Sequence, residues 1–435
     1  MRIEGNPPVP YFPFKVRRRE KKWETINPVE ANEYELNAAA VRILQLCDGY
    51  NTVDEVVSSL NIEFRTDITQ IRTIVNDLLE NLTAKSMVWF RKERMQWFSP
   101  PPPKFVLWDI TSKCNLRCLH CVSSAGKKSE GELSTEECKR LLDELSRLGV
   151  QTIIFSGGEP LLRDDFFEIA EYASKMGFLL QLVTNGTLIN YEVAQKIKIL
   201  NLYAQVSLDG SSPEINDRFR GKRGSYKKTI KGIQILLEVG VPIMIETAVT
   251  KLNINDIPHI LNLAIALGVN SFRILPFVPG GRGKNHQDLE LAPDEMKKVT
   301  AYLRGKREEG RIEIVPMEFE WTFSESTVEI ADPSARIGCD AATSFCTITP
   351  TGEVLPCDFF RGVEADNIRI HEFSWIWYYS RFLNYFRSLN ISDIQGVCRE
   401  CKWLSLCRGS CIAPNYVHGA LFQSNCHCWI ACDEL

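Results

Sequence analysis

The sequence predicts an α/β protein in which a central parallel sheet lies between a small N-terminal domain and a cysteine-rich C-terminal domain. Strand-like and helix-like segments alternate between residues 105 and 276, which predicts repeated βα units with right-handed crossovers. Four consecutive prolines, Pro100 to Pro103, precede that region. Ten of the 15 cysteines lie after residue 338, so the last part of the chain differs in composition from the rest.

The overall composition is that of a globular protein with two or three domains, with 435 residues, 44% of them hydrophobic, and a net charge of -4. There is no basic excess, so no nucleic-acid partner is expected. No membrane span is expected either, because no run of about 18 apolar residues occurs. The start of the chain, Met1 to Gly5, lacks the apolar core of a signal peptide. We therefore expect a cytoplasmic protein, whose thiols stay reduced.

Residues 1–97 form the first predicted domain. Short strands are expected between Pro13 and Asn27, and Asn37 is a good N-cap for the helix that follows. Thr52 and Glu55 have the spacing of a capping box for a second helix. Helices are expected over Ala38–Cys47, Val53–Leu60 and Thr66–Leu82, and a strand over Met87–Phe90. This order is a winged-helix pattern, but the third helix carries few cations for DNA phosphates.

Residues 98–104 are expected to be a stiff, proline-rich linker. The central domain follows and spans residues 105–325. Its strands are expected over Phe105–Ile110, Thr152–Phe155, Leu179–Thr184, Ala204–Leu208, Ile243–Val249 and Ser271–Pro276. Its helices are expected over Thr135–Leu148, Phe166–Met176, Tyr191–Leu200, Tyr226–Val239 and Ile257–Leu267. Six βα units are two short of a complete eight-unit barrel.

A tight loop after the first strand of this domain carries Cys114, Cys118 and Cys121 at the spacing C-x3-C-x2-C. Three thiolates match three corners of a [4Fe–4S] cube and leave the fourth iron without a protein ligand, unlike a ferredoxin. Zinc fits poorly, because its loops normally bring cysteines in pairs. An open iron can chelate a small molecule and pass it an electron.

This cysteine loop resembles the signature of the radical S-adenosylmethionine (SAM) enzymes. The resemblance implies a partial (β/α)6 barrel, SAM chelated to the open iron, and one-electron cleavage of SAM to a 5′-deoxyadenosyl radical. The second strand is followed by Gly157, Gly158 and Glu159. The two glycines would let backbone approach a ligand closely, and Glu159 offers an acceptor for an ammonium group. In the family, this motif holds the SAM amino group.

The same resemblance implies further SAM contacts at the strand ends. Asn185 and Ser207 would hydrogen-bond the ribose and carboxylate of SAM, Arg220 would pair with the carboxylate, and His120 would lie near the adenine. Three of these residues have a simpler interpretation. Asn185 could be a turn residue, Arg220 a solvated charge at a helix end, and His120 a ring that shields the cluster. The loop over residues 276–283 is a candidate contact for SAM or substrate.

The C-terminal cysteines are ordered as Cys339-x6-Cys346, Gly352-x4-Cys357 and Cys398-x2-Cys401-x5-Cys407-x3-Cys411, followed by Cys426, Cys428 and Cys432. Thr351-Gly352 predicts a hairpin turn. Over residues 326–435 this array resembles the SPASM extension, which implies two auxiliary [4Fe–4S] clusters and thus three in all. One cluster would use Cys339, Cys346, Cys357 and Cys411. The other would use Cys398, Cys401, Cys407 and one late cysteine; spacing favours Cys428 over Cys426, and Cys432 is late. A pair of structural zinc sites is the alternative.

Asp358 directly follows Cys357. In sulfatase-maturing relatives an aspartate at this position is the proposed proton acceptor during substrate oxidation, a role that suits a carboxylate beside a cluster. The alternative is a hairpin-end aspartate that bonds nearby backbone. Glu318 and Glu320 are weaker candidates for the same role.

Tyr34 to Asn37 and Asp48 to Val56 are similar to the peptide-binding domain known from the pyrroloquinoline quinone pathway. That domain is also called the recognition element of ribosomally made, post-translationally modified peptides (RiPPs). The resemblance implies that a precursor's leader peptide adds as a strand to an open sheet edge.

Together, the three resemblances predict a peptide maturase that makes an oxidative crosslink, such as a thioether or carbon–carbon bond. It would need a reductant such as flavodoxin or ferredoxin. Two alternatives stay open: a sulfatase-type maturase that oxidises a Cys or Ser side chain, and an iron–sulfur redox sensor that binds DNA.

Overall fold

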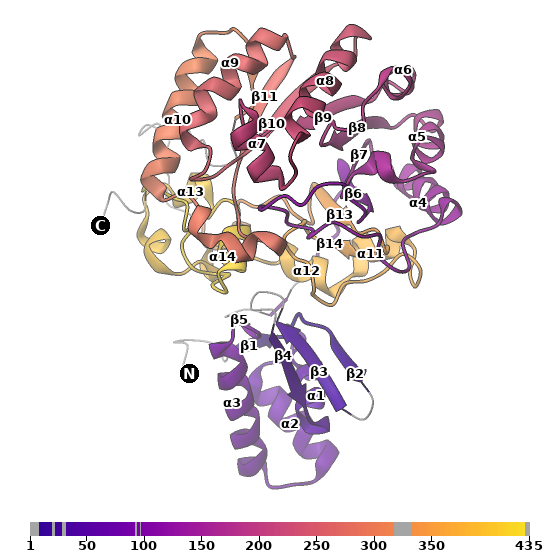
Figure 1. The fold of residues 1–435 in the computed structure, drawn as a ribbon. Coiled ribbons are helices and arrows are strands. Elements are labelled where there is room, and N and C mark those ends of the chain that lie inside the picture. Colours follow the sequence, from indigo (N-terminus) through magenta and orange to yellow (C-terminus); the bar gives the residue numbers. More distant parts are fainter. Residues whose placement is uncertain are drawn as a thin grey trace.

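The computed structural model describes residues 8–19, 22–27, 32–91, 94–95, 97–316 and 332–430. A small N-terminal domain lies against a larger body that is built around one curved sheet (Figure 1). That sheet has nine strands in the order β12-β11-β10-β9-β8-β7-β6-β13-β14. Each neighbouring pair is parallel except β13 and β14. The predicted α/β class is therefore confirmed.

All six predicted strands are present, each within two residues of its expected ends. They are β6 (Phe105–Thr111), β7 (Thr152–Gly157), β8 (Leu179–Thr184), β9 (Tyr203–Ser207), β10 (Ile243–Val249) and β11 (Ser271–Pro276). The sheet extends further than six strands, through β12 (Glu313–Ile314) at one edge and β13 (Phe345–Ile348) with β14 (Val354–Leu355) at the other. The apolar residues of the six barrel strands are largely buried, as expected for a parallel sheet with both faces covered.

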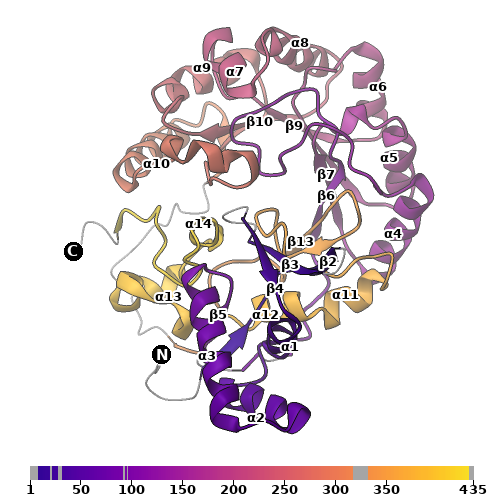
Figure 2. The same ribbon diagram turned by 60° about the horizontal axis from the view of Figure 1, so that its bottom comes forward.

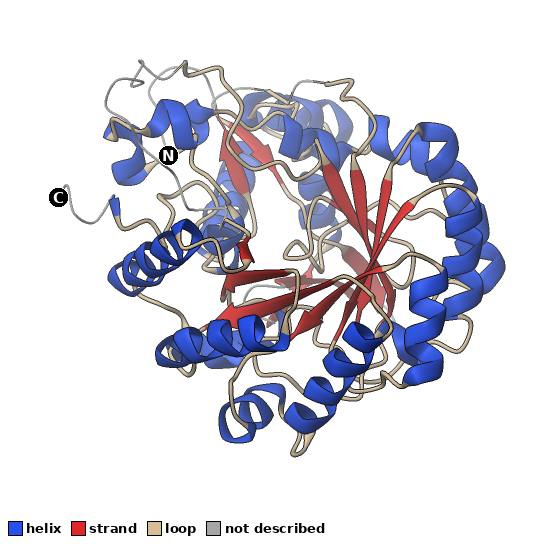
Figure 3. Ribbon diagram, turned by 90° about the horizontal axis from the view of Figure 1, so that it is seen from above, coloured by secondary structure: helices blue, strands red, loops and turns tan. Residues whose placement is uncertain are grey.

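Helices cover the outer, convex face of this sheet (Figures 2 and 3). They are α4 (Thr135–Leu148), α5 (Phe166–Lys175), α6 (Tyr191–Ile199), α7 (Pro213–Arg220), α8 (Ser225–Glu238), α9 (Ile257–Leu267) and α10 (Pro293–Glu308). Five of them match predicted helices, whereas α7 and α10 were not expected. The ends follow local chemistry: Ser134 and Glu137 form a capping box for α4, and Gly149 ends it with a φ of 93°.

The C-terminal region contributes directly to the barrel sheet. Strand β13 pairs in parallel with β6, with Cys346 opposite Val106, and β14 then turns back against β13. The predicted hairpin turn is confirmed, and Gly352 adopts a φ of 89° there. The helices α11 (Phe373–Tyr379), α12 (Arg381–Arg387), α13 (Leu404–Cys407) and α14 (Ala413–Val417) complete this region. The predicted division at residues 325 and 326 therefore does not separate two sheets.

The N-terminal domain has the predicted order of strands and helices. An antiparallel sheet of β2 (Val16–Arg19), β3 (Lys22–Asn27) and β4 (Asn32–Leu36) precedes α1 (Ala38–Leu46), α2 (Val53–Phe64) and α3 (Ile68–Ala84). Asn37 caps α1, and Thr52 with Glu55 forms the capping box of α2, as predicted. The strands β1 (Val9–Tyr11) and β5 (Trp89–Arg91) pair with each other. None of the described helices is long and apolar enough to cross a membrane.

A buried ion pair fixes this domain to the larger body. The Arg91 guanidinium donates to the Asp393 carboxylate at 2.9 and 3.0 Å and to Ser388 Oγ at 2.6 Å. Both charged side chains are at most 4% exposed. Beside them the rings of Tyr11 and Tyr385 stack with centroids 4.0 Å apart.

We predict that Arg91→Ala loosens the N-terminal domain, because it leaves Asp393 buried without its cation. The expected cost is about 3–5 kcal/mol, measured by urea unfolding and by faster proteolysis within residues 98–104. Arg94→Ala is the matched control, since its partner Glu55 is 42% exposed, and it should cost about 1 kcal/mol or less. Equal effects of the two variants would contradict a docking role for Arg91.

Candidate active site

A cavity of about 240 Å³ opens at the carboxyl ends of the barrel strands, the edge at which parallel sheets carry their sites. The predicted residues that line it are Cys114, Cys118, His120, Cys121, Gly157, Gly158, Asn185, Ser207, Arg220 and Asp358. The loop after β11 also contributes Phe277 and Val278. Of the predicted SAM-binding residues, Glu159 is not part of this lining.

The cysteine loop is held by backbone hydrogen bonds from distant segments. The amides of Arg117 and Leu119 donate to the carbonyls of Arg220 and Phe219 at 3.2 and 3.0 Å. Two amides also point at sulfur: Leu116 N lies 3.5 Å from Cys114 Sγ, and Ala125 N lies 3.3 Å from Cys121 Sγ. Amide donors of this kind stabilise a thiolate over a thiol.

Four glycines let other segments reach this loop. A Cβ at Gly158 would lie 2.3 Å from the Lys113 carbonyl oxygen, and one at Gly157 would lie 2.4 Å from that of Thr111. A Cβ at Gly221 would lie 2.4 Å from the Arg117 carbonyl oxygen, and one at Gly281 would lie 2.0 Å from that of Val122. Gly157 and Gly158 also line the cavity, so their backbone lies against the cysteine loop and borders the space where a ligand would bind.

The three thiols suit a metal cluster. Burial is the main cause that raises the pKa of Cys114 to about 11, and the neighbouring Cys118, Glu159 and Cys121 contribute to the rise. Placing three thiolates side by side requires concentrated positive charge at the same place, which the iron of a cluster would supply. Cys114, Cys118 and Cys121 are not joined in disulfides.

Glu159 has a different setting from the one predicted. Its carboxylate is fully buried and accepts hydrogen bonds from Thr184 Oγ1 and Asn185 N, both at 2.8 Å, and from Leu161 N at 3.3 Å. Burial raises its pKa to about 7, although these hydrogen bonds oppose the rise. The side chain therefore ties the end of β7 to the end of β8.

Arg220 is not the solvated charge of the alternative interpretation. Its Nε forms a buried ion pair with Asp209 Oδ2 at 2.6 Å, and its Nη1 lies 3.9 Å from Cys118 Sγ. Asp209, at the end of β9, was not among the predicted site residues. The His120 ring packs on Phe219 at 4.5 Å, and burial with the nearby Arg220 and Arg282 charges holds the pKa of His120 well below its usual range.

Asn185 and Ser207 both line the cavity at strand ends, as predicted. The Asn185 side chain donates to Asn115 Oδ1 at 2.9 Å and accepts from Thr187 N at 2.9 Å. Much of its hydrogen-bonding capacity thus serves the turn around it, which agrees with the alternative interpretation of this residue.

Asp358 shares an arginine with a second carboxylate that was not predicted. The Arg361 guanidinium donates to both Asp358 and Asp109. Burial raises the pKa of Asp109 to about 7, and the Asp358 charge raises it as well. The sequence carried a signal for Asp109, because it is an acidic residue inside the apolar strand β6.

The later cysteines fall into separate neighbourhoods. Burial raises the pKa of Cys407 to about 12, with contributions from the Cys398, Cys401 and Cys428 thiols, so these four sulfurs lie near one another. Cys426 instead hydrogen-bonds His418. Cys339, Cys357 and Cys411 are partly buried. Cys432, Glu318 and Glu320 lie outside the described residues.

Cys346 differs from the other predicted cluster ligands. Its side chain is fully buried in β13. Burial raises the pKa of the Cys346 thiol, and the Arg387 guanidinium opposes that rise. The isolated Cys47 and Cys138 are buried apolar residues, 1% and 0% exposed.

Comparison with known protein families agrees with this arrangement. The radical SAM superfamily model matches residues 108–264, the coenzyme PQQ synthesis protein D (PqqD) model matches residues 26–88, and the SPASM iron–sulfur cluster-binding domain model matches residues 339–402. The AdoMet-dependent heme synthase of Methanosarcina barkeri is 32% identical over 72% of this chain and 92% of its own. Mycofactocin maturase MftC of Mycolicibacterium smegmatis is also 32% identical, over 73% and 80%.

Solved structures share the fold. Streptococcus suis SuiB bound to S-adenosylmethionine aligns with a TM-score of 0.61 at 16% identity, over 96% of this chain and 99% of its own. Native anSMEcpe with bound AdoMet aligns with a TM-score of 0.60 at 20% identity, over 76% and 95%. The chain therefore belongs to the radical SAM superfamily and carries PqqD and SPASM domains at its two ends. It is an enzyme that uses SAM and iron–sulfur chemistry.

We predict that Gly158→Ala displaces the cysteine loop, because the added methyl would overlap the Lys113 carbonyl. Iron in the anaerobically reconstituted protein should fall by about four per chain, measured by iron assay and by electron paramagnetic resonance of the reduced protein. Gly305→Ala, within α10, is the control: a Cβ there meets nothing within 4 Å, and helix stability should rise by up to about 1 kcal/mol. Full iron content in Gly158→Ala would contradict this account of the loop.

Proposed function

We propose that the chain modifies a ribosomally made precursor peptide, which it captures by the leader and oxidises at the barrel cavity. The observation that carries this proposal is the PqqD-type domain docked by a buried ion pair onto a radical SAM barrel. MftC is named a maturase, and SuiB has been solved with its precursor peptide SuiA. Such a product would carry an oxidative crosslink of the thioether or carbon–carbon type.

The leader would bind at the edge of the N-terminal sheet. Strand β4 is an edge strand of that sheet, since it pairs only with β3 in the described part of the chain. In Figure 1 it is the strand of the sheet drawn nearest to α3. Helix α3 exposes two isoleucines, Ile68 and Ile74, at 45% and 48%. An open strand edge beside exposed apolar side chains suits a peptide that adds as a strand and buries its own apolar residues.

At the cavity, the cluster and SAM would together supply a carbon radical that takes a hydrogen atom from the peptide. The chain's own residues would bind and orient the reactants. Arg220 offers the cation for the SAM carboxylate, the backbone around Gly158 approaches its amino group, and His120, kept neutral, lies by the adenine. Asn185 and Ser207 would lie beside the ribose of SAM.

Asp358 would accept the proton that the substrate loses as it is oxidised. It lines the cavity and is held by Arg361, so its carboxylate has a fixed position. The same guanidinium nitrogen also donates to Asp109, which holds Arg361 in place beside Asp358. Positioning of this kind is what a general base needs.

We further propose two auxiliary clusters, for three [4Fe–4S] clusters in all. One would be held by Cys398, Cys401, Cys407 and Cys428, whose thiols influence one another. The second would be held by Cys339, Cys346, Cys357 and Cys411. A flavodoxin or ferredoxin would act as the reductant that supplies the electron for SAM cleavage, and the auxiliary clusters would pass the second electron of the oxidation to the oxidised form of such a carrier. We propose no nucleic-acid partner.

A tetrapyrrole is the second candidate substrate, because the first relatives found are named heme synthases. The docked peptide-recognition domain favours the peptide. A sulfatase-type maturase would not need a peptide-recognition domain. The anSMEcpe structure aligns with 76% of this chain, so about a quarter of the chain has no counterpart in that alignment.

The decisive experiment combines the reduced enzyme, SAM and any short peptide that a reading frame next to its gene encodes. We predict that the peptide loses about 2 mass units per crosslink, as two hydrogen atoms are removed, and that tandem mass spectrometry places the bond. A peptide without its leader should react at least about tenfold more slowly, through weaker binding. Conversion of an iron porphyrin precursor, with the peptide unchanged, would overturn the proposal.

We also predict that Asp358→Asn lowers crosslink formation by about 10²-fold or more, because a proton acceptor is lost. Hydrogen abstraction should survive, so 5′-deoxyadenosine should still accumulate. Asp340→Asn is the matched control: Asp340 also follows a cluster cysteine directly, but it is exposed and lies outside the cavity. Normal crosslinking by Asp358→Asn would exclude this residue as the acceptor.

A further inference from the structure

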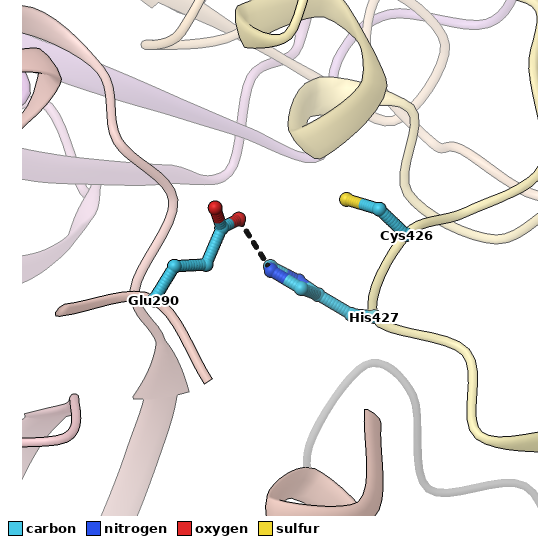
Figure 4. A group of neighbouring side chains, drawn as sticks. All are labelled: Glu290, Cys426 and His427. Carbon is cyan, nitrogen blue, oxygen red and sulfur yellow. Dashed lines mark hydrogen bonds and ion pairs between the residues drawn. The ribbon is translucent and has the colours of Figure 1, made fainter. Parts of the chain in front are cut away.

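Four side chains with metal-binding atoms meet where the barrel rim touches the C-terminal segment. Glu290 directly follows the short helix η3 (Gly281–Leu289). Its Oε1 lies 2.7 Å from His427 Nε2, and its Oε2 lies 2.9 Å from His418 Nε2. Cys426 is adjacent, with its sulfur turned toward the carboxylate (Figure 4).

The spacing of three of these ligand atoms suits a single ion, and the fourth residue, His418, hydrogen-bonds Glu290 and Cys426. The ligand atoms of Glu290, Cys426 and His427 all lie within 4.8 Å of one another. Tetrahedral zinc, with bonds of about 2.0–2.3 Å, holds its ligand atoms about 3.3–3.8 Å apart. Small side-chain movements would therefore suffice, as the carboxylate exchanges its hydrogen bonds to the imidazoles for bonds to the metal.

We propose that Glu290, His418, Cys426 and His427 form a mononuclear site for a Zn²⁺-type ion, separate from the iron–sulfur clusters. One carboxylate, two imidazoles and one thiolate satisfy a borderline divalent cation in tetrahedral geometry. His427 is 2% exposed and Glu290 14% exposed at the side chain, so the site is shielded on the barrel side. His418 is 32% exposed, which leaves a route of entry.

The sequence alone assigned Cys426 and Cys428 as rivals for one cluster position. The structure gives them different neighbours, since Cys428 influences Cys407 and Cys426 hydrogen-bonds His418. The intervening loop is fixed by Asn425, which accepts from His427 N and donates to the Cys411 carbonyl, both at 2.9 Å. The two thiols therefore do not compete.

The position of the site suggests a structural role for the ion. On one side it holds the loop that carries Cys428. On the other side it holds the end of η3. Near the start of η3, the backbone amide of Arg282 donates to the Cys121 carbonyl at 2.9 Å, and its guanidinium donates to the Cys118 carbonyl at 3.1 Å. One ion would thus join the auxiliary-cluster segment to the rim segment that supports the SAM-cluster loop.

The test is a metal count on the full-length, anaerobically reconstituted protein, supplied with Zn²⁺ and passed through gel filtration. We expect one zinc per chain in addition to the irons. Absorption fine structure at the zinc edge should report one sulfur at about 2.3 Å and three nitrogen or oxygen ligands at about 2.0–2.1 Å. Glu290→Gln and Cys426→Ser should lose the zinc and keep the iron, whereas Glu309→Gln and His371→Ala should keep both metals.

Two results would overturn the proposal. Loss of about four irons in Cys426→Ser, without zinc in the parent protein, would assign Cys426 to a cluster. Absence of zinc with unchanged iron in every variant would leave only a hydrogen-bonded network. If a variant fails to fold, competition for Zn²⁺ between the unaltered protein and a chromogenic chelator decides the matter, and a site that loses to a micromolar chelator contradicts the proposal.

Discussion

The structure depends on the close backbone packing that fixes the cysteine loop. Segments from three different parts of the barrel reach this loop through glycines, and a side chain at any of them would overlap a carbonyl of the loop. Because the loop is held by backbone contacts, its three thiols keep their positions without relying on one another. That rigidity would let the three cysteines hold a cluster at the cavity, which Arg220 and Asp358 also line.

The two ends of the chain are built onto this centre. Strand β13 extends the barrel sheet next to β6, the strand that leads into the cysteine loop, so the auxiliary-cluster region and the SAM cluster share one sheet. The N-terminal domain is joined to the C-terminal region by Arg91 and Asp393. If the first domain holds a peptide as proposed, this ion pair would fix the position of that peptide relative to the larger body.

The sequence predicted the parts that have local signals. Strand and helix periods, the caps at Asn37 and Thr52, and the cysteine spacing were sufficient for six strands, the N-terminal helices and the cluster loop. Pairings between distant segments had no such signal: β13 with β6, Asp209 with Arg220, and Glu290 with His427. The motif at Gly157, Gly158 and Glu159 also carried no local signal that its two glycines pack against the cysteine loop.

The central claim is that the Cys114, Cys118 and Cys121 loop holds a cluster with one iron open to SAM. The most direct measurement is the yield of 5′-deoxyadenosine from SAM by the dithionite-reduced enzyme, compared with Cys118→Ala. The account predicts continuing formation of 5′-deoxyadenosine by the unaltered enzyme, stimulated by substrate, and none by the variant. Equal yields from both proteins, or no 5′-deoxyadenosine from an enzyme with full iron content, would contradict it.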